Sequence, residues 1–276
     1  MKTNQHWIPR SLLQRFASPD GRPNQVYRID VRTGATVGPT AARNFSAKRH
    51  YNRVNLLSKP DTLENLFQVL EGPMARAIAH IERTDSMPDS VRLNHVAAAM
   101  ALQALRTPLH ERHAIDEIAE VRRQHPEDVP EQDSEQEAAL AWARRLARFD
   151  PTRLALGKKP WTLLVAPTDG PYFVCPDPPP YLGLLDEDAL GSVASSDVDK
   201  QEVLIVFPLT RRHLLASSPR FEKGLITLNQ RGVAYYNMLA FNWAREFVYS
   251  PVPKPHVEQS GVFVLDREGV HFPHTG

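Results

Sequence analysis

The sequence predicts an α+β fold in which a helical first half packs on a mixed or antiparallel sheet from the second half. Apolar residues recur at helical spacing through most of residues 63–149. In the second half the pattern changes to short β-rich runs, of which 203–207 is the clearest. We therefore expect residues 1–276 to form a single domain. Residues 1–150 should be mainly helical with an early hairpin, and residues 151–276 should be rich in strands with a late helix.

The first expected element is a short helix that begins at Pro9, because proline suits a first helical turn, where its missing N–H costs nothing. Leu12, Leu13 and Phe16 give this helix an apolar face that requires burial. We expect it to dock between the central helix of the first half and the strand that ends near Cys175.

A β-hairpin and an interrupted helix are expected next. Gln25–Asp30 alternates polar and apolar residues as a strand does, and Ala35–Val37 returns as the second strand. Asp61 or Thr62 then caps a helix with an apolar face. Gly72-Pro73 is expected to break or bend that helix.

The central helix of the first half starts near Pro88 and is mostly apolar, so we place it in the core. Pro108 interrupts it, because proline removes one backbone hydrogen bond, and the helix resumes through Ile118. An acidic surface loop over 124–137 and a further helix over 138–149 complete this half.

In the second half, strands are expected at 161–166, 172–175 and 203–207, where β-branched and aromatic residues cluster. A helix is expected over 228–247, with its apolar side chains inward. A hairpin around Asp266–Gly269 follows.

The charge of the chain is unevenly distributed. The net charge is +1, yet residues 1–62 hold eleven Lys and Arg against three acids, a local net charge of +8. Such a region permits contact with the phosphate backbone of RNA or DNA, or else its charges only solvate the hairpin. Cys175 is the sole cysteine, so no internal disulfide can form. No apolar run approaches the roughly 18 residues of a membrane helix, and no secretory signal is present, so we expect a cytoplasmic protein without membrane contact.

Several short motifs occur in a recognisable order along the chain. They are His6-x-x-Pro9, Gln103-x-x-Arg106-Thr107-Pro108, Phe173–Pro179, Pro208-Leu209-Thr210 and Asn237. In this order they resemble the bacterial domain-of-unknown-function family 4238, and the resemblance covers most of the chain. Cys175, Pro176 and Pro178 depart from the family's Thr-Ser-Asp-Asn pattern but leave Asp177 in place. The resemblance implies candidate polar positions and no particular reaction.

A polar stripe runs along the central helix. Gln103 and Arg106 are three residues apart and share one face, which His95, His110 and His113 extend. A buried arginine needs an anionic partner. That partner is either a bound phosphate or an aspartate that bridges the two halves of the fold. The two later histidines have ligand-like spacing but no cysteine or glutamate at motif distance, so zinc is weakly supported.

The remaining candidates are carboxylates and one histidine. Asp177 follows a strand among prolines, where it either takes part in chemistry or accepts hydrogen bonds from nearby backbone N–H groups. Glu71 shares a helical face with Glu64 and Gln68, which either binds a divalent metal together with Asp177 or is simply solvated. His6 is a candidate general acid or base, since imidazole titrates near neutral pH, and equally a candidate helix cap.

These residues suggest a phosphodiester hydrolase of the nuclease type, acting in bacterial defence or as a toxin. Gln103 belongs to the candidate site, in which Arg106 would hold the phosphate and His6 would be the general acid or base. Asp177 with Glu71 would bind Mg²⁺ or Mn²⁺, or would orient His6. Arg106 is expected to keep Asp177 ionised. The alternative is a non-enzymatic module that binds nucleic acid or a partner protein. It is suggested by the lack of any P-loop, Rossmann, serine-hydrolase or zinc-deaminase motif.

Overall fold

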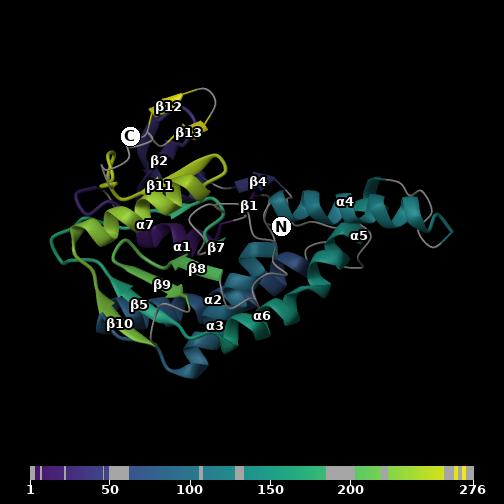
Figure 1. Cartoon of the computed structure of the whole chain (residues 1–276), viewed down its shortest axis with the longest axis horizontal. Helices are drawn as coiled ribbons and strands as arrows, with labels where there is room; N and C mark the ends of the chain where they lie inside the picture. The colour runs from purple at the N-terminus through teal and green to yellow at the C-terminus, as the bar shows by residue number, and fades with distance from the viewer. Residues whose placement is uncertain are drawn as a thin grey trace.

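The computed structural model of the chain has the expected α+β fold, with most helices in the first half (Figure 1). The structure describes residues 4–6, 8–21, 23–45, 47–49, 62–105, 108–127, 134–184, 203–218, 223–257, 264–266 and 269–271. Within these ranges only the backbone is described at some positions, among them 4–6 and 108–110. No helix within these ranges is both long and apolar enough to cross a membrane.

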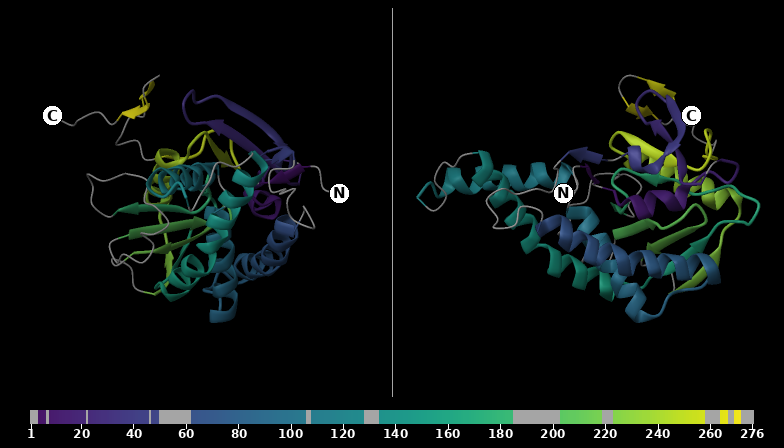
Figure 2. Two further views of the ribbon diagram at one scale, coloured as in Figure 1. Left: turned by 90° about the vertical axis from the view of Figure 1, so that its right-hand side faces the viewer. Right: turned by 180° about the vertical axis from the view of Figure 1, so that it is seen from behind.

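Seven α-helices and two short 3₁₀ helices are present in the described residues. They are α1 (Arg10–Leu13), η1 (Gln14–Phe16), η2 (Ala42–Asn44), α2 (Thr62–Thr84), α3 (Ser90–Leu105), α4 (Pro108–Gln124), α5 (Ser134–Ala147), α6 (Phe149–Lys158) and α7 (Gln230–Trp243). Helix α3 packs against α2 and α6. Helices α4 and α5 contact each other and extend away from the other helices (Figure 2).

The strands form two larger sheets and two small pairs. They are β1 (Asn4–His6), β2 (Gln25–Asp30), β3 (Thr36–Ala41), β4 (Ala47–Arg49), β5 (Thr162–Val165), β6 (Cys175–Pro176), β7 (Tyr181–Leu184), β8 (Val203–Pro208), β9 (His213–Ser217), β10 (Gly224–Thr227), β11 (Phe247–Ser250), β12 (Val264–Asp266) and β13 (Gly269–His271). The first sheet has the order β10-β5-β9-β8-β7 and is mixed, because β10 runs parallel to β5 while the other pairs are antiparallel. The second sheet, β3-β2-β11-β6, is antiparallel and joins the early hairpin to strands of the second half. Strands β1 and β4 form one small pair, and β12 and β13 form the other, which confirms the late hairpin.

The inner strands β5, β8 and β9 of the five-stranded sheet are covered on both faces, which explains why they are largely apolar, whereas the edge strand β10 is mostly exposed. Leu163 and Val165 of β5 belong to a core shared with α2, α3 and α6. Leu164 between them belongs to a second core, together with Val233 of α7. Alternate residues of a strand point to opposite faces, so the continuous apolar run fills both cores.

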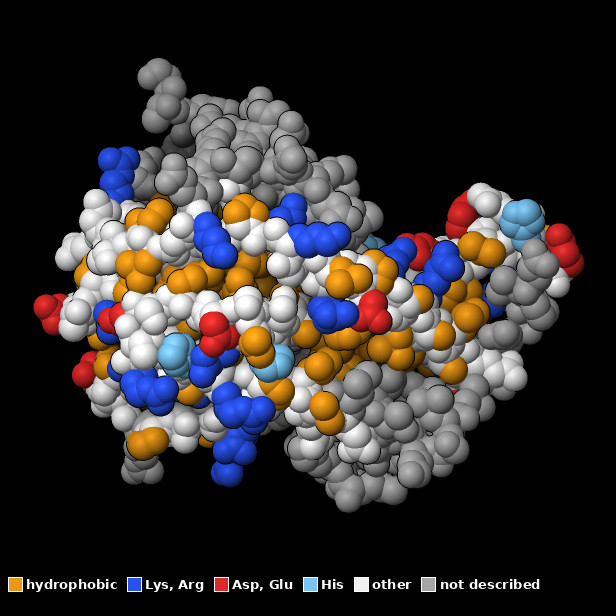
Figure 3. All heavy atoms as spheres, turned by 90° about the horizontal axis from the view of Figure 1, so that it is seen from below, with side chains coloured by type: hydrophobic (Ala, Val, Ile, Leu, Met, Phe, Trp, Pro, Cys, Tyr) orange, Lys and Arg blue, Asp and Glu red, His pale blue; other side chains and the backbone are white. Residues whose placement is uncertain are grey.

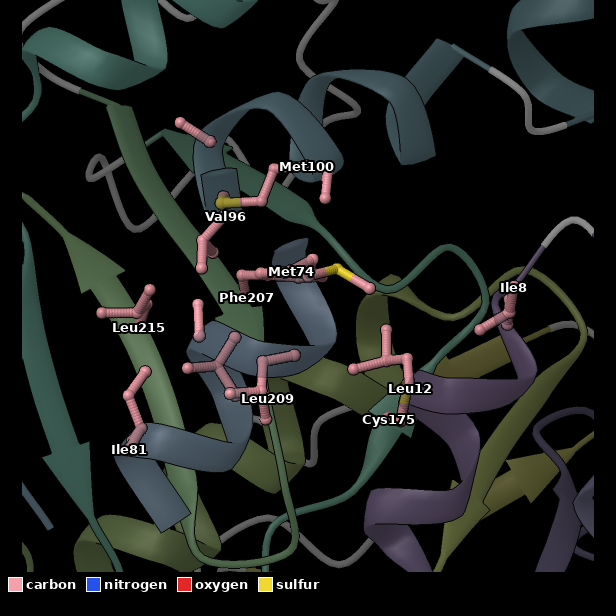
Figure 4. Close-up of a cluster of buried hydrophobic side chains, with 14 of the residues drawn as sticks. Ile8, Leu12, Met74, Ile81, Val96, Met100, Cys175, Phe207, Leu209 and Leu215 are labelled. Carbon is pink, nitrogen blue, oxygen red and sulfur yellow. The ribbon is translucent and has the colours of Figure 1, made fainter. Parts of the chain in front are cut away.

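The N-terminal helix is buried as expected. Leu12, Leu13 and Phe16 are fully buried in the core that also contains α2 and α3 residues. Figure 4 shows Leu12 beside Cys175, which is the strand neighbour that the sequence predicted. The helix expected beside α1 was the central helix α3, but the helix that packs against α1 is α2, whose Met74 belongs to the same core.

The expected break at Gly72-Pro73 is wrong, because α2 is helical from Thr62 to Thr84 with Pro73 inside it. Phe67, Met74 and Ile78 on the two sides of the proline are all buried. Burial of this continuous apolar face stabilises the helix enough to outweigh the hydrogen bond that proline removes.

Two expectations for the second half also need correction. The helix predicted over 228–247 ends at Trp243, and Phe247–Ser250 is instead strand β11, paired with β2 and β6. Of the strand predicted at 172–175, only Cys175 joins a ladder. Helix α6 also crosses the expected boundary at residue 151 and ends at Lys158.

Candidate functional site

The guanidinium of Arg28 on β2 lies over two aromatic rings. Its guanidinium carbon lies 4.4 Å from the ring centre of Phe247 and 5.3 Å from that of Phe45. The sheet register explains this contact, because Phe247 and Tyr249 of β11 pair with residues 30 and 28 of β2 and point to one face. The Phe45 ring also contacts the Tyr249 ring, with centres 5.8 Å apart. The half-buried Arg28 side chain is therefore fixed in orientation by its neighbours.

The donors of Arg28 are not used within the described residues of the protein. No described residue accepts a hydrogen bond from this guanidinium, and no described carboxylate forms an ion pair with it. None of its nitrogens is sealed from solvent without a partner. Arginine carries five N–H donors in a planar fork that matches carboxylate and phosphate oxygens. The arrangement can therefore receive an anion.

Asp177 lies on the other side of the same β11 segment and holds its start in place. Its Oδ1 accepts hydrogen bonds from three backbone N–H groups, those of Arg245 at 3.1 Å, Glu246 at 3.1 Å and Phe247 at 2.9 Å. Two backbone hydrogen bonds join the same segments, from Asp177 to the Phe247 carbonyl and from Arg245 to the Asp177 carbonyl. Asp177 and Arg28 thus meet the same residue, one at its backbone and the other at its ring. We call Arg28, Phe45, Asp177 and Phe247 the Phe247 site.

Burial raises the pKa of Asp177 from 3.8 to about 6, although its three N–H hydrogen bonds act to lower it and the charge of Glu246 raises it further. This direction is opposite to the one expected from a neighbouring Arg106, whose position lies outside the described residues. The second oxygen, Oδ2, accepts no hydrogen bond from the described residues. Asp177 therefore performs the backbone role that was the alternative to chemistry, and it also keeps one oxygen available with a pKa near neutrality.

The convergence of the other predicted site residues stays a prediction. His6 lies in β1, where its backbone pairs with that of Ala47, and its side chain lies outside the described residues, as does all of Arg106. Gln103 is buried on α3, and Glu71 is half-buried on α2.

The histidine stripe is not uniform in its surroundings. His95 is exposed on α3, His113 is half-buried on α4, and the side chain of His110 is outside the described residues, as is that of Glu64. Within the described ranges, no three His, Cys, Asp or Glu side chains gather as metal ligands would. The metal role of Glu71 with Asp177 thus stays a prediction.

A second polar cluster, which sequence reasoning missed, links the sheet to the helices at the β8–β9 turn. The buried His213 contacts Thr210 Oγ1 through Nδ1 at 2.8 Å and Asp85 Oδ1 through Nε2 at 2.7 Å. Thr210 Oγ1 also accepts the backbone N–H groups of Arg212 and His213, both at 3.0 Å. With both lone pairs of Oγ1 occupied, the hydroxyl donates to Nδ1, so the imidazole is neutral with its proton on Nε2. The Pro208-Leu209-Thr210 motif was the feature of the sequence that could have pointed to this cluster.

The electrostatics of this turn cluster agree with its structural role. Burial lowers the pKa of His213, with the hydrogen bond to Asp85 acting in the opposite direction. For Asp85, burial raises the pKa, but hydrogen bonds from His213 and Arg212 and the positive charge of Arg212 outweigh it, so the pKa is lowered. Arg212 also forms an ion pair with Asp85 at 3.3 Å. Thr210 is too enclosed to act as a nucleophile, because it is 1% exposed and fully hydrogen-bonded.

Asn237 of α7 holds the irregular segment before β6. Its Oδ1 accepts from the Val174 N–H at 3.1 Å, and its Nδ2 donates to the carbonyls of Tyr172 at 2.9 Å and His256 at 2.8 Å. These side-chain bonds replace a strand ladder, which explains why 172–174 is not a strand. Cys175 beside it is fully buried and burial raises its pKa well above 9.0, so this thiol belongs to the core.

The model of the family described as a protein of unknown function (DUF4238) matches residues 4–251. The chain therefore belongs to this family. No curated protein matches the chain, and no solved structure matches it either.

Proposed function

We propose that the protein binds nucleic acid, RNA or DNA, through phosphate contacts of its basic N-terminal region. The observation that carries the proposal is the state of Arg10, Arg28 and Arg43, which form no ion pair with any described carboxylate. They lie on α1, β2 and η2; α1 contacts η2, and the residue after η2 is Phe45, whose ring Arg28 covers. Cations without carboxylate partners can replace the counterions of a phosphate backbone.

Outside the N-terminal region, several described arginines form ion pairs with acids, while others, such as Arg76, Arg83 and Arg112, form none with a described carboxylate. On α4 and α5, Arg122 pairs with Glu137, and Arg144 and Arg148 both pair with Glu117. Figure 3 shows one face of the molecule, on which Lys and Arg side chains lie among apolar and other side chains and have acidic side chains beside only some of them. What distinguishes residues 1–62 is their local net charge of +8, and together with the lack of described carboxylate partners at Arg10, Arg28 and Arg43 this charge supports the N-terminal region as the nucleic-acid surface.

The test is a dissociation constant for labelled single-stranded and double-stranded RNA and DNA, measured across salt. The wild type is compared with a triple variant, Arg10→Gln with Arg28→Gln and Arg43→Gln. We expect the triple variant to bind more weakly and the slope of log K against log salt to fall by about 2 to 3, roughly one per lost phosphate contact.

The matched control removes the same charge from arginines that pair with acids, by Arg92→Gln with Arg123→Gln and Arg153→Gln. It should bind like the wild type. No binding at low salt, or an equal loss in the two triple variants, contradicts the proposal. A protein partner in place of nucleic acid predicts a shallow salt dependence.

A second candidate is phosphodiester hydrolysis at the Phe247 site, favoured by the Asp177 carboxyl with a pKa of about 6 and a second oxygen without a described donor. A carboxyl of this pKa can exchange a proton near neutral pH. Arg28 and Arg106 would hold the phosphate, and His6 would be the second proton-transfer group.

The assay for hydrolysis uses labelled RNA and DNA with Mg²⁺, Mn²⁺ or EDTA, and the variants Asp177→Asn, His6→Ala and Arg106→Ala. Product that forms with the wild type and falls in the variants supports the enzyme. Absence of product under all conditions, or product that persists in every variant, excludes it.

A further inference from the structure

We propose that Arg28 is a preformed site for a single phosphate group, with the guanidinium edge as donor and the Phe45 and Phe247 rings as the clamp that fixes its plane. The inference rests on the proposed function for its ligand class and assigns one residue as the phosphate anchor. A guanidinium whose plane is already fixed loses less conformational freedom when a ligand binds. Two ring contacts, with the guanidinium carbon 4.4 and 5.3 Å from the ring centres, restrain the Arg28 side chain before any ligand arrives.

Two other stacked arginines show what sets Arg28 apart. Arg145 lies 3.6 Å from the Trp142 ring centre, but this residue is 2% exposed, so no ligand reaches it. Arg211 lies 5.5 Å from the Tyr172 ring centre and donates from Nη1 to the Ala17 carbonyl at 3.0 Å. Arg28 combines stacking with solvent access and with donors that no described residue uses.

The nearby acids do not neutralise Arg28. Asp30 is two residues along the same strand, but its Oδ1 accepts the backbone N–H groups of Arg32 and Thr33, each at 2.9 Å. Asp177 directs its Oδ1 to the backbone at 245–247. Arg43 stands two residues before Phe45 in the chain and is exposed. An anion with two or more oxygens in one plane fits this edge, and phosphate carries the most charge among such common ligands.

The experiment follows the side-chain Nε–H of Arg28 by ¹H–¹⁵N NMR of the full chain, because stacking on two rings gives this proton a ring-current shift. Inorganic phosphate, a nucleoside monophosphate and a short single-stranded DNA are titrated separately, with chloride and acetate at equal ionic strength as controls. We expect saturable shifts of this signal with the three phosphate ligands only.

Two variants test separately how much the planar guanidinium and the ring contacts contribute to phosphate binding. Arg28→Lys keeps the charge but loses the planar fork, and should weaken phosphate binding by about tenfold. Phe247→Leu keeps the guanidinium but removes one ring, and should weaken it by roughly threefold while moving the Arg28 signal toward the position of an unstacked arginine.

The inference is overturned if chloride shifts the Arg28 signal as phosphate does, or if Arg28→Lys binds phosphate like the wild type. If Arg28→Lys does not fold, the wild-type titrations and Phe247→Leu still decide. If phosphate binds at Arg28 but nucleic acid does not bind the protein, the proposed function is contradicted and the phosphate site is supported. Nucleic-acid binding that Arg28→Lys leaves unchanged removes this site and keeps the proposed function.

Discussion

Two groups of polar residues in this molecule differ in whether the protein itself provides their hydrogen-bond or ion-pair partners. In the second half, the side chains of Asp177 and Asn237 each make three hydrogen bonds to other segments of the chain, and that of Thr210 makes three within the β8–β9 turn. In the N-terminal region, Arg10 and Arg28 have no described carboxylate partner. The first group stabilises the fold, because each buried polar atom needs its partner. The second group adds little to stability in its present state and is free to meet a ligand.

Membership of a family motif therefore does not by itself tell what a residue does in this protein. Asp177, Asn237 and Thr210 all lie in segments that resemble the family's motifs, and all three serve mainly to hold backbone. Arg28 belongs to none of the quoted motifs, yet it offers the accessible donors. Substitutions in the two groups should therefore act on different measurements, with stability affected in one and binding in the other.

The largest expected effect is that of Asp177→Ala on the free energy of unfolding. The change removes the acceptor of the Glu246 and Phe247 N–H groups, while the Arg245 N–H keeps its hydrogen bond to the Asp177 carbonyl. We expect a loss of about 3 to 5 kcal/mol, because each unsatisfied buried donor costs about 1 to 3 kcal/mol. Urea unfolding followed by circular dichroism measures it.

Asp177→Asn is the matched control for this prediction. It retains an amide oxygen in the place of Oδ1 and removes only the charge. Its loss should be well below that of the alanine variant. Equal stability of the two variants would show that the N–H hydrogen bonds do not hold the start of β11.

The next effect is that of Thr210→Val at the β8–β9 turn. Valine has nearly the shape of threonine but leaves two backbone N–H groups and His213 Nδ1 without the hydroxyl. We expect a loss of about 2 to 3 kcal/mol in the free energy of unfolding. Thr210→Ser, which keeps the hydroxyl, should lose much less, and the cluster is not stabilising if valine and serine behave alike.

The sequence allowed prediction of the elements whose apolar pattern is strong. Val203–Phe207 was recognised as a strand because it fills two cores, and Leu12 and Phe16 were placed in the core by their spacing. Phe247 was assigned to a helix because it stands four residues after Trp243 and continues the helical pattern. The helical pattern is overridden there because Phe247–Ser250 pairs with β2. That strand lies more than 200 positions earlier in the chain, so no local pattern reveals the pairing.

The candidate site was only partly predictable, for the same reason. The sequence singled out Asp177 by its place after a strand, but its partners at 245–247 come from another segment, so its raised pKa and backbone role were not visible. The stacking of Arg28 depends on Phe45 and Phe247, which the sheet brings together from opposite ends of the chain. The net charge of residues 1–62 was visible, whereas which of its arginines lack carboxylate partners required the structure.

The pH dependence of stability should distinguish two buried groups with opposite signs. The pKa of His213 is lowered from 6.5, so as pH falls below about 6.5 the unfolded chain takes up the proton first and stability is lost. The pKa of Asp177 is raised from 3.8 to about 6, so as pH falls through 6 the folded chain takes up the proton first and stability is gained.

These contributions oppose each other near pH 6, and single variants reveal them. Relative to the wild type, Asp177→Asn should lose stability more steeply as pH falls from 7 to 5. His213→Gln should lose it less steeply over the same range. Thermal unfolding at several pH values tests both, and parallel pH profiles for all three proteins would show that neither group titrates as described.

The smallest effect on stability is expected in the N-terminal region, and it completes the comparison. Arg10→Gln and Arg43→Gln remove exposed guanidinium groups that pair with no described carboxylate, so the free energy of unfolding should change by less than about 0.5 kcal/mol. The same two changes should weaken nucleic-acid binding at low salt, because each removes one phosphate contact. Urea unfolding and salt-dependent binding on the same samples test both halves of the statement. A stability loss as large as that of Thr210→Val would mean that these arginines hold the fold together, and the distinction between the two groups would then fail.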